Sequence, residues 1–394
     1  MNRLDAELKS RLAAIHEAGL LRELCRVDSP QGTRIKLSGR ELLNFSSNDY
    51  LGLANHPALK TAAIKAVTDF GAGAGASRLI CGSLAPFHEL EETLATFKGT
   101  KAALTFSTGY ATAVGTIAAL LSKDDIIIVD KLVHACIVDA AKLSGAKLRV
   151  FAHNDLNDLE DILKWAAAKS KSSGQIKRNV LIVTESIFSM DGDAAPLKEI
   201  VVLKEKYGAW LMVDEAHATG LYGVNRRGLA EALGISDHIE IQMGTLGKAL
   251  GASGGYICGS RTLIDFLVNR ARSFIFSTAP VPAAAAAATA AIKLVQSDEG
   301  KNLNGQLWVR VAEFKSTIRN PQCAIQSAII PIILGEEAKA VESATRLREQ
   351  GFFVPAIRYP TVARGAARLR VTLTAAHTSA DIAALTTALT ATGI

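Results

Sequence analysis

Short apolar runs that recur between residues 102 and 243 constrain the fold more than any other feature of the sequence. The runs are Ala102–Phe106, Ile126–Val129, Val180–Val183, Trp210–Val213 and Ile239–Met243. Each has the length of a strand, and helical stretches connect each run to the next. Strands buried on both faces of a parallel sheet have this composition, and the connecting helices cover the faces. The sequence therefore predicts an α/β fold with a mostly parallel central sheet.

The chain of 394 residues is too long for one hydrophobic core, since cores usually split beyond about 250–300 residues. From Pro280 the pattern changes to an alanine-rich helix opened by Pro282, followed by scattered strands. We expect an N-terminal helix and arm over residues 1–45, a large domain over 46–280 and a smaller C-terminal α+β domain over 281–394. The strands expected in the C-terminal domain are Ile329–Leu334, Phe352–Ala356 and Ala367–Leu373.

The N-terminal segment has apolar residues at helical spacing. Leu4, Leu8, Leu12 and Ile15 recur with charged residues between them. This pattern predicts an amphipathic helix that packs on another part of the protein. Acidic residues in the same segment argue against a signal peptide, so a cytoplasmic location is expected.

Composition limits the classes of function. The formal net charge is +6, but Lys and Arg are spread along the chain, which favours a small anionic substrate over a nucleic acid. No apolar stretch reaches the roughly 18–20 residues that span a bilayer, so no membrane partner is expected. The five cysteines are far apart and form no CxxC pair. They predict reduced thiols and no metal site.

A glycine motif resembles a dinucleotide-binding loop. Gly71, Gly73 and Gly75 form GxGxG, but residues 62–70 before them have helical spacing. A dinucleotide-binding loop follows a strand. A nicotinamide site is therefore not expected there.

A second motif matches an ATPase signature. Asp214–His217 reads Asp-Glu-Ala-His, and Gly247-Lys248 resembles the end of a phosphate loop. Such a loop needs glycine five positions before Gly247 and Ser or Thr after the lysine. This chain has Gln242 and Ala249 there. An ATP-dependent nucleic-acid protein is therefore the weakest alternative.

The same residues fit a pyridine cofactor better. Asp214 follows an apolar strand, where a carboxylate can pair with a protonated pyridine nitrogen, and His217 lies about one turn further on. Lys248 follows another strand among small residues that let a flat cofactor approach the backbone. Partial burial would lower its pKa and make the amine nucleophilic. Taken singly, such a lysine is usually a solvated charge, and such an aspartate is often a helix cap.

Two weaker signals lie upstream. Residues 107–110 join a strand to a helix through Gly109, and a helix N-terminus offers N–H groups to a phosphate. His134 follows the strand at 126–129, where an imidazole could stack on an aromatic cofactor. A packed, hydrogen-bonded histidine is the commoner outcome.

Several segments together resemble the α-oxoamine synthases. They are Asn44–Leu53, Asp130–His134, Phe188–Asp193, Val213–His217 and Thr245–Lys248. The resemblance covers nearly the whole chain in order. It implies a fold-type I enzyme that uses pyridoxal phosphate (PLP) to join an amino acid to an acyl thioester with loss of carbon dioxide. Phe151–Asp155, Ala356–Thr361 and Ala367–His377 resemble members that use L-alanine and a pimeloyl thioester in biotin biosynthesis.

The resemblance also implies roles for cofactor residues. Lys248 would bind the cofactor covalently and later remove the Cα proton. Asp214 would pair with the pyridine nitrogen, and His217 would donate a hydrogen bond to the ring oxygen. His134 would stack on the ring and touch the substrate. The residues expected near the phosphate and the ring are Gly109, Tyr110, Thr245 and Ser189.

Substrate residues follow from the same resemblance. Arg370 would bind the amino-acid carboxylate, a task suited to its planar guanidinium. Arg22 and Thr361 would contact the acyl substrate, and Asn48 is a further substrate residue. Glu185 and Ser77 also lie in family motifs without a defined role. Tyr359 departs from the family, which has a second proline there.

The expected partners are L-alanine and either pimeloyl-coenzyme A or a pimeloyl-acyl carrier protein. The resemblance also implies a homodimer. Two alternatives stay open: another α-oxoamine synthase that uses glycine or serine with a different acyl group, and an aminotransferase, which would form no carbon–carbon bond.

Overall fold

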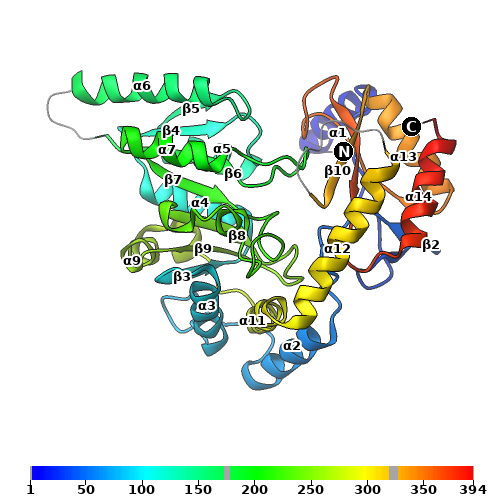
Figure 1. Ribbon diagram of the computed structural model, residues 1–394, viewed down its shortest axis with the longest axis horizontal. Coiled ribbons are helices and arrows are strands. Elements are labelled where there is room, and N and C mark those ends of the chain that lie inside the picture. The colour runs from blue at the N-terminus through cyan, green and yellow to red at the C-terminus, as the bar shows by residue number, and fades with distance from the viewer. Residues whose placement is uncertain (1, 173–177, 319–326, 394) are drawn as a thin grey trace. The chain divides into compact units, whose positions relative to one another are not determined.

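The computed structural model describes residues 2–172, 178–318 and 327–393 (Figure 1). Cys323 lies outside the described residues. The chain divides into two compact units. The terminal unit comprises Met1–Ser47, Met190–Gly192 and Gln306–Ile394, and the sheet unit comprises Asn48–Ser189 and Asp193–Gly305. The sheet unit extends past residue 280, where the sequence predicts a boundary, because α11 (Pro282–Gln296) packs on α2 (Pro57–Phe70) and α3 (Ala85–Lys98).

A seven-stranded sheet forms the centre of the sheet unit within the described ranges. Its strands, in order across the sheet, are β3 (Ala102–Phe106), β9 (Gly255–Gly259), β8 (Ile241–Thr245), β7 (Trp210–Asp214), β6 (Val180–Glu185), β4 (Ile126–Asp130) and β5 (Lys147–Phe151). All neighbours from β8 to β5 are parallel, and β9 is antiparallel to both β3 and β8. The predicted α/β fold with a mostly parallel sheet is confirmed.

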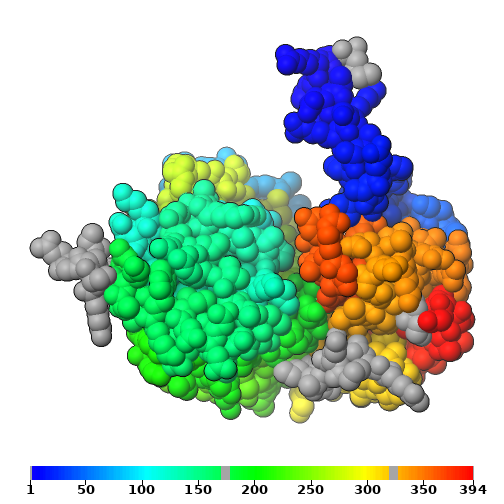
Figure 2. Space-filling view, turned by 90° about the horizontal axis from the view of Figure 1, so that it is seen from above, coloured from blue at the N-terminus to red at the C-terminus, as the bar shows by residue number. Residues whose placement is uncertain are grey.

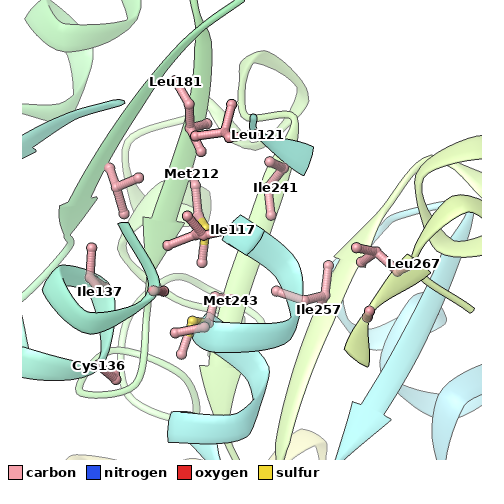
Figure 3. Close-up of a cluster of buried hydrophobic side chains, with 14 of the residues drawn as sticks. Ile117, Leu121, Cys136, Ile137, Leu181, Met212, Ile241, Met243, Ile257 and Leu267 are labelled. Atoms are coloured by element: carbon pink, nitrogen blue, oxygen red, sulfur yellow. The ribbon is translucent and has the colours of Figure 1, made fainter. Parts of the chain in front are cut away.

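Helices cover both faces of this sheet. One face packs against α4 (Gly109–Leu120), α5 (Ala135–Ser144), α9 (Arg261–Arg270) and α10 (Arg272–Ile275). Figure 3 shows this core, where Ile117 of α4 lies close to Met212 and Met243 of the strands. The other face packs against α6 (Leu156–Ser172), α7 (Leu197–Tyr207) and α8 (Leu229–Ala232). Burial on both faces explains the continuous apolar strands. The short 3₁₀ helix η1 (Ser236–His238) precedes β8.

The terminal unit holds two small sheets and several helices. One sheet contains β1 (Arg34–Leu37), β2 (Arg40–Asn44) and β11 (Phe352–Phe353), and the other contains β10 (Ile329–Gly335), β13 (Ala367–Thr372) and β12 (Ala356–Ile357). The helices are α1 (Arg3–Glu17), the C-terminal part of α12 (Asp298–Thr317), α13 (Glu337–Glu349) and α14 (Ser379–Ala391). The single strand predicted at 352–356 is two short strands, because Pro355 between them has no N–H for a ladder.

Helix α1 forms as the spacing predicts, and Asn2 caps it by accepting the N–H of Asp5 at 2.8 Å. None of its residues is buried, and Leu4 exposes 64% of its surface. Figure 2 shows α1, in dark blue, standing away from the rest of its own unit. The predicted packing of its apolar face is therefore absent from the described chain. Among the helices that the structure describes, none is both long enough and apolar enough to cross a bilayer.

Candidate active site

Polar side chains end four neighbouring strands of the sheet unit. Asp130 ends β4, Glu185 ends β6, Asp214 ends β7 and Thr245 ends β8. The carboxyl ends of parallel strands meet at one edge of a sheet, which is where ligands bind in open α/β folds. These four residues therefore mark the edge on which a site can form.

Lys248 lies in a bend just after β8. A hydrogen bond from the N–H of Gly251 to its carbonyl, at 2.8 Å, closes the bend. Its Nζ lies 2.7 Å from Nε2 of His217. The other ring nitrogen, Nδ1, lies 2.6 Å from the hydroxyl of Tyr50, which also contacts Oδ1 of Asn48 at 3.3 Å. The structure thus joins Lys248, His217 and Asn48, three predicted site residues, in one hydrogen-bonded chain.

Asp214 and Glu185 are paired across β6 and β7, and both are buried. Burial raises the pKa of Asp214, and the positive charge of Lys248 opposes this. Burial, and then the charge of Asp214, raise the pKa of Glu185 to about 8. Two buried carboxyls this close do not both ionise readily. Glu185 therefore holds a proton near neutral pH, which leaves the negative charge on Asp214.

His134 is the N-cap of α5. Its Nδ1 accepts the N–H of Cys136 at 3.2 Å and lies 3.0 Å from the Cys136 sulfur. Burial raises the pKa of the Cys136 thiol to about 12, so the thiol is protonated and can donate. Desolvation and the charge of Lys248 lower the pKa of His134. The imidazole is therefore neutral at physiological pH, with its hydrogen on Nε2.

The N-terminus of α4 lies beside β8 and β9. A Cβ built on Gly109 would lie 3.9 Å from Cβ of Thr245, and one built on Gly255 would lie 2.8 Å from Cα of Gly109. Glycine at these positions lets the helix start approach the strand ends closely. The first N–H groups of a helix have no acceptor within it and attract a phosphate. The hydroxyl of Tyr110 donates to Asp139 at 2.9 Å.

These groups suit PLP. The site offers an amine for its aldehyde carbon, a buried carboxylate for its ring nitrogen and a helix N-terminus for its phosphate. Lys248, Asp214, His217, His134, Gly109 and Thr245 would hold the cofactor. Their individual roles stay predictions.

The other predicted residues have different settings. Ser189 donates its N–H to Glu185 within the sheet unit, and Ser77 pairs with Thr278 in an isolated bridge. Three predicted substrate residues belong to the terminal unit, namely Arg22, Thr361 and Arg370.

Within the terminal unit, Arg370 is buried in β13 and donates to Oγ1 of Thr372 at 3.0 Å. Arg22 is exposed in the irregular segment after α1, and Thr361 is exposed in a turn closed by its N–H to the carbonyl of Arg358 at 3.0 Å. Their contacts with substrate stay predictions.

Sequence reasoning missed Tyr50 and assigned no role to Glu185. Tyr50 is fully buried and lies in the segment 44–53 that carries the family resemblance. Glu185 accepts the backbone N–H of His134 at 2.6 Å as well as that of Ser189. Both lie in recognised motifs, but their partners are distant in sequence, so only the structure reveals the contacts.

A buried ion pair supports the segment that carries Asp214 and His217. Lys98 of α3 donates to Oε2 of Glu215, and both side chains are almost inaccessible to solvent. Oε1 of Glu215 accepts the N–H of Ala230 at 2.9 Å. Removing one partner of such a pair leaves an uncompensated buried charge.

We therefore expect Lys98→Met to destabilise the protein by about 3–5 kcal/mol. Thermal and urea unfolding of the purified variant would measure this loss. The double variant Lys98→Met/Glu215→Gln should recover much of it, because no buried charge is left unpaired. Equal stability of Lys98→Met and the wild type would contradict the prediction.

Comparisons with known proteins show the family of the chain. The family described as aminotransferase class I and II matches residues 40–389. The chain is 46% identical to an 8-amino-7-oxononanoate synthase of Geobacter sulfurreducens, with 96% of each chain covered. It is 48% identical to one of Anaeromyxobacter sp. (strain Fw109-5), with 98% of this chain and 94% of the relative covered.

Solved structures share the fold. A serine palmitoyltransferase from S. paucimobilis with bound PLP-myriocin aldimine is 27% identical, with a TM-score of 0.90 and 100% of this chain and 98% of that chain covered. An 8-amino-7-oxononanoate synthase from Francisella tularensis is 28% identical, with a TM-score of 0.74 and 89% and 97% covered.

Proposed function

The chain belongs to the aminotransferase class I and II family and, within it, to the 8-amino-7-oxononanoate synthases, and from this we propose its reaction. It condenses L-alanine with a pimeloyl thioester to give 8-amino-7-oxononanoate, carbon dioxide and a free thiol, in biotin biosynthesis. The observation that carries the proposal is the amine of Lys248, hydrogen-bonded to His217 at the strand edge that holds the buried Asp214. The enzyme is a fold-type I transferase that uses PLP.

When bound, PLP withdraws electrons from the Cα of an attached amino acid, so that its Cα proton becomes acidic. Asp214 would pair with the ring nitrogen of the cofactor, and because Glu185 holds a proton, the negative charge stays on Asp214. Lys248 would hold the cofactor, and its amine, when free, would accept the Cα proton of L-alanine. Nζ of Lys248 lies 2.7 Å from Nε2 of His217, whose Nδ1 lies 2.6 Å from the hydroxyl of Tyr50, and these contacts orient the base.

His134 contributes a hydrogen-bond donor and stays neutral while it does so. Its neutral ring, held at Nδ1 by Cys136, presents the Nε2 hydrogen as a donor. A neutral donor suits a site that already contains the charge of Lys248. Arg370 binds the carboxylate of L-alanine, and Arg22, Thr361 and Asn48 contact the substrates. The net charge of +6 suits either carrier of the pimeloyl group, polyanionic coenzyme A or an acidic carrier protein.

The test is spectroscopic and chemical. Purified protein is loaded with PLP, and its visible absorbance is recorded before and after addition of L-alanine, glycine or L-serine. Pimeloyl-coenzyme A or a pimeloyl-acyl carrier protein is then added, and carbon dioxide, thiol and 8-amino-7-oxononanoate are measured. Equimolar products from L-alanine would support the proposal. A stronger response to glycine or serine would favour another α-oxoamine synthase, and turnover without carbon dioxide would favour an aminotransferase.

We also propose that the protein acts as a homodimer. Ile80 and Phe276 expose 79% and 71% of their surfaces, and the Ser77–Thr278 bridge joins the segments that carry them. Large apolar side chains that gather on a surface commonly mark an interface. In the terminal unit, helix α1 has exposed apolar residues of its own.

Light scattering should therefore give twice the chain mass for the wild type. The double variant Ile80→Asp/Phe276→Asp should shift the protein towards monomer. Val202→Asp, which charges a similarly exposed residue of α7, is the matched control. A monomeric wild type at micromolar concentration would contradict the proposal.

A further inference from the structure

His153 lies between β5 and α6, in the Phe151–Asp155 motif, and the proposed reaction leaves it without a role. Its Nδ1 lies 2.9 Å from Oδ1 of Asp130, and its Nε2 lies 2.8 Å from Oδ2 of Asp193. The ring packs edge-on against Phe188, with 4.4 Å between centroids. The imidazole therefore bridges a carboxylate at the end of β4 and a carboxylate from the loop that follows β6.

Asp130 organises the loop that leads to His134. Its side chain is fully buried, and its Oδ1 accepts the N–H of Leu132 at 2.7 Å. Its Oδ2 accepts the N–H of Asn154 at 2.9 Å. A buried carboxylate needs compensation, and His153 is its cationic contact in the described structure.

Asp193 closes the loop that carries Ser189. Its carbonyl accepts the N–H of Phe188 at 2.9 Å, and its carboxylate also accepts Nδ2 of Asn154 at 2.9 Å. At the sheet edge the same two loops meet again, because Glu185 accepts the N–H groups of both His134 and Ser189. His153 and Glu185 thus connect the two loops at two separate places.

We propose that His153 is a positioning residue, whose imidazole, held between Asp130 and Asp193, fixes the two loops that present His134 and Ser189 to the cofactor. This inference rests on the proposed function, since it assigns His134 and Ser189 to the cofactor site. Two charge-assisted hydrogen bonds give such a bridge both strength and direction. A displacement of about 1 Å at a reacting group can lower a rate about 100-fold.

The charge state of His153 supports this role. Burial opposes protonation, but the hydrogen bonds to Asp130 and Asp193 outweigh it and raise the pKa of His153 to about 10. The ring is therefore cationic at physiological pH. Because the folded pKa is raised, the stabilisation is complete below a pH of about 6.5 and is lost as the pH rises through about 10.

The experiment compares His153→Gln and Asp193→Asn with the wild type. Glutamine is uncharged and carries both of its N–H donors on one nitrogen, so it cannot reproduce the cationic bridge through two ring nitrogens. Asp193→Asn removes one charge while keeping the shape. The control is His238→Gln, because His238 contacts Glu205 at 2.6 Å in an exposed pair that precedes β8. PLP affinity is measured by absorbance without any acyl substrate, alongside the unfolding midpoint and kcat and KM for L-alanine.

We expect His153→Gln to weaken PLP binding about 10-fold and to lower kcat about 10- to 100-fold, with KM for L-alanine changed less. In Asp193→Asn the alkaline loss of PLP affinity should begin at lower pH, because His153 has lost one carboxylate. The double variant His153→Gln/Asp193→Asn should lose little more PLP affinity and kcat than either single variant, because both substitutions disrupt the same bridge.

Wild-type PLP affinity and kcat in folded His153→Gln would overturn the proposal. It would also be overturned by two results together. The losses of PLP affinity and kcat would match the fraction of variant that is unfolded, and the alkaline loss of PLP affinity in Asp193→Asn would begin at the same pH as in the wild type. A wild type that binds PLP but does not condense L-alanine with a pimeloyl thioester would refute the proposed function alone. The affinity measurements would still decide the role of His153.

Discussion

Lys248→Ala is expected to abolish the visible band of bound PLP and to lower kcat by at least about 10²–10⁴-fold. In the proposed mechanism the amine attaches the cofactor and then acts as the base at Cα, and loss of a general base alone has an effect of that size. Absorbance spectra of the loaded variant, with and without L-alanine, measure the first effect. Production of 8-amino-7-oxononanoate measures the second.

Lys131→Ala is the matched control for this prediction. Lys131 follows β4 at the same edge of the sheet, but its side chain is exposed. Its loss removes a positive charge without removing the base. The visible band of bound PLP and kcat should therefore stay close to the wild-type values. A Lys248→Ala variant that kept the band and the rate would show that another amine binds the cofactor.

Asp214→Asn is expected to lower kcat about 10²–10³-fold, the size of effect seen when one preorganised electrostatic contact is lost. A neutral amide cannot stabilise the protonated ring nitrogen, so the Cα proton becomes less acidic. The substitution should also lower the pKa of Glu185, because the negative charge of Asp214 helps to raise it. Steady-state rates and pH titration of the cofactor absorbance would measure both effects.

The control for this variant is Asp237→Asn, which removes an exposed carboxylate before β8. It should leave both the rate and the titration unchanged. If Asp214→Asn kept more than about a tenth of the wild-type kcat, Asp214 would not be the partner of the ring nitrogen.

The sequence predicted the strands that are buried on both faces. Runs such as 102–106 and 210–213 match β3 and β7 within a residue, because burial on both faces excludes polar residues from a run. Strand β8 begins two residues later than predicted. Strands β5 and β9 were not predicted. Lys147 and Arg149 interrupt the apolar pattern of β5, and β9 begins and ends with glycine.

The candidate site was predictable where its chemistry is local. Lys248 and Asp214 each follow an apolar strand, and the segments around them carry the family resemblance. The terminal unit shows the limit of such reasoning, because the spacing in residues 4–15 predicts helix α1 correctly but says nothing of what packs on it.

The sequence by itself thus determined the α/β class, the cofactor chemistry and the family. Each depends on short segments, and the residue types in a segment indicate whether it is a buried strand or a family motif. Only the tertiary structure decided the chain from Tyr50 through His217 to Lys248, the raised pKa of Glu185 beside Asp214, and the bridge made by His153. Each of these joins side chains that lie on different strands or loops. Their distances, and hence their pKa values, exist only once the sheet has brought the strand ends to one edge.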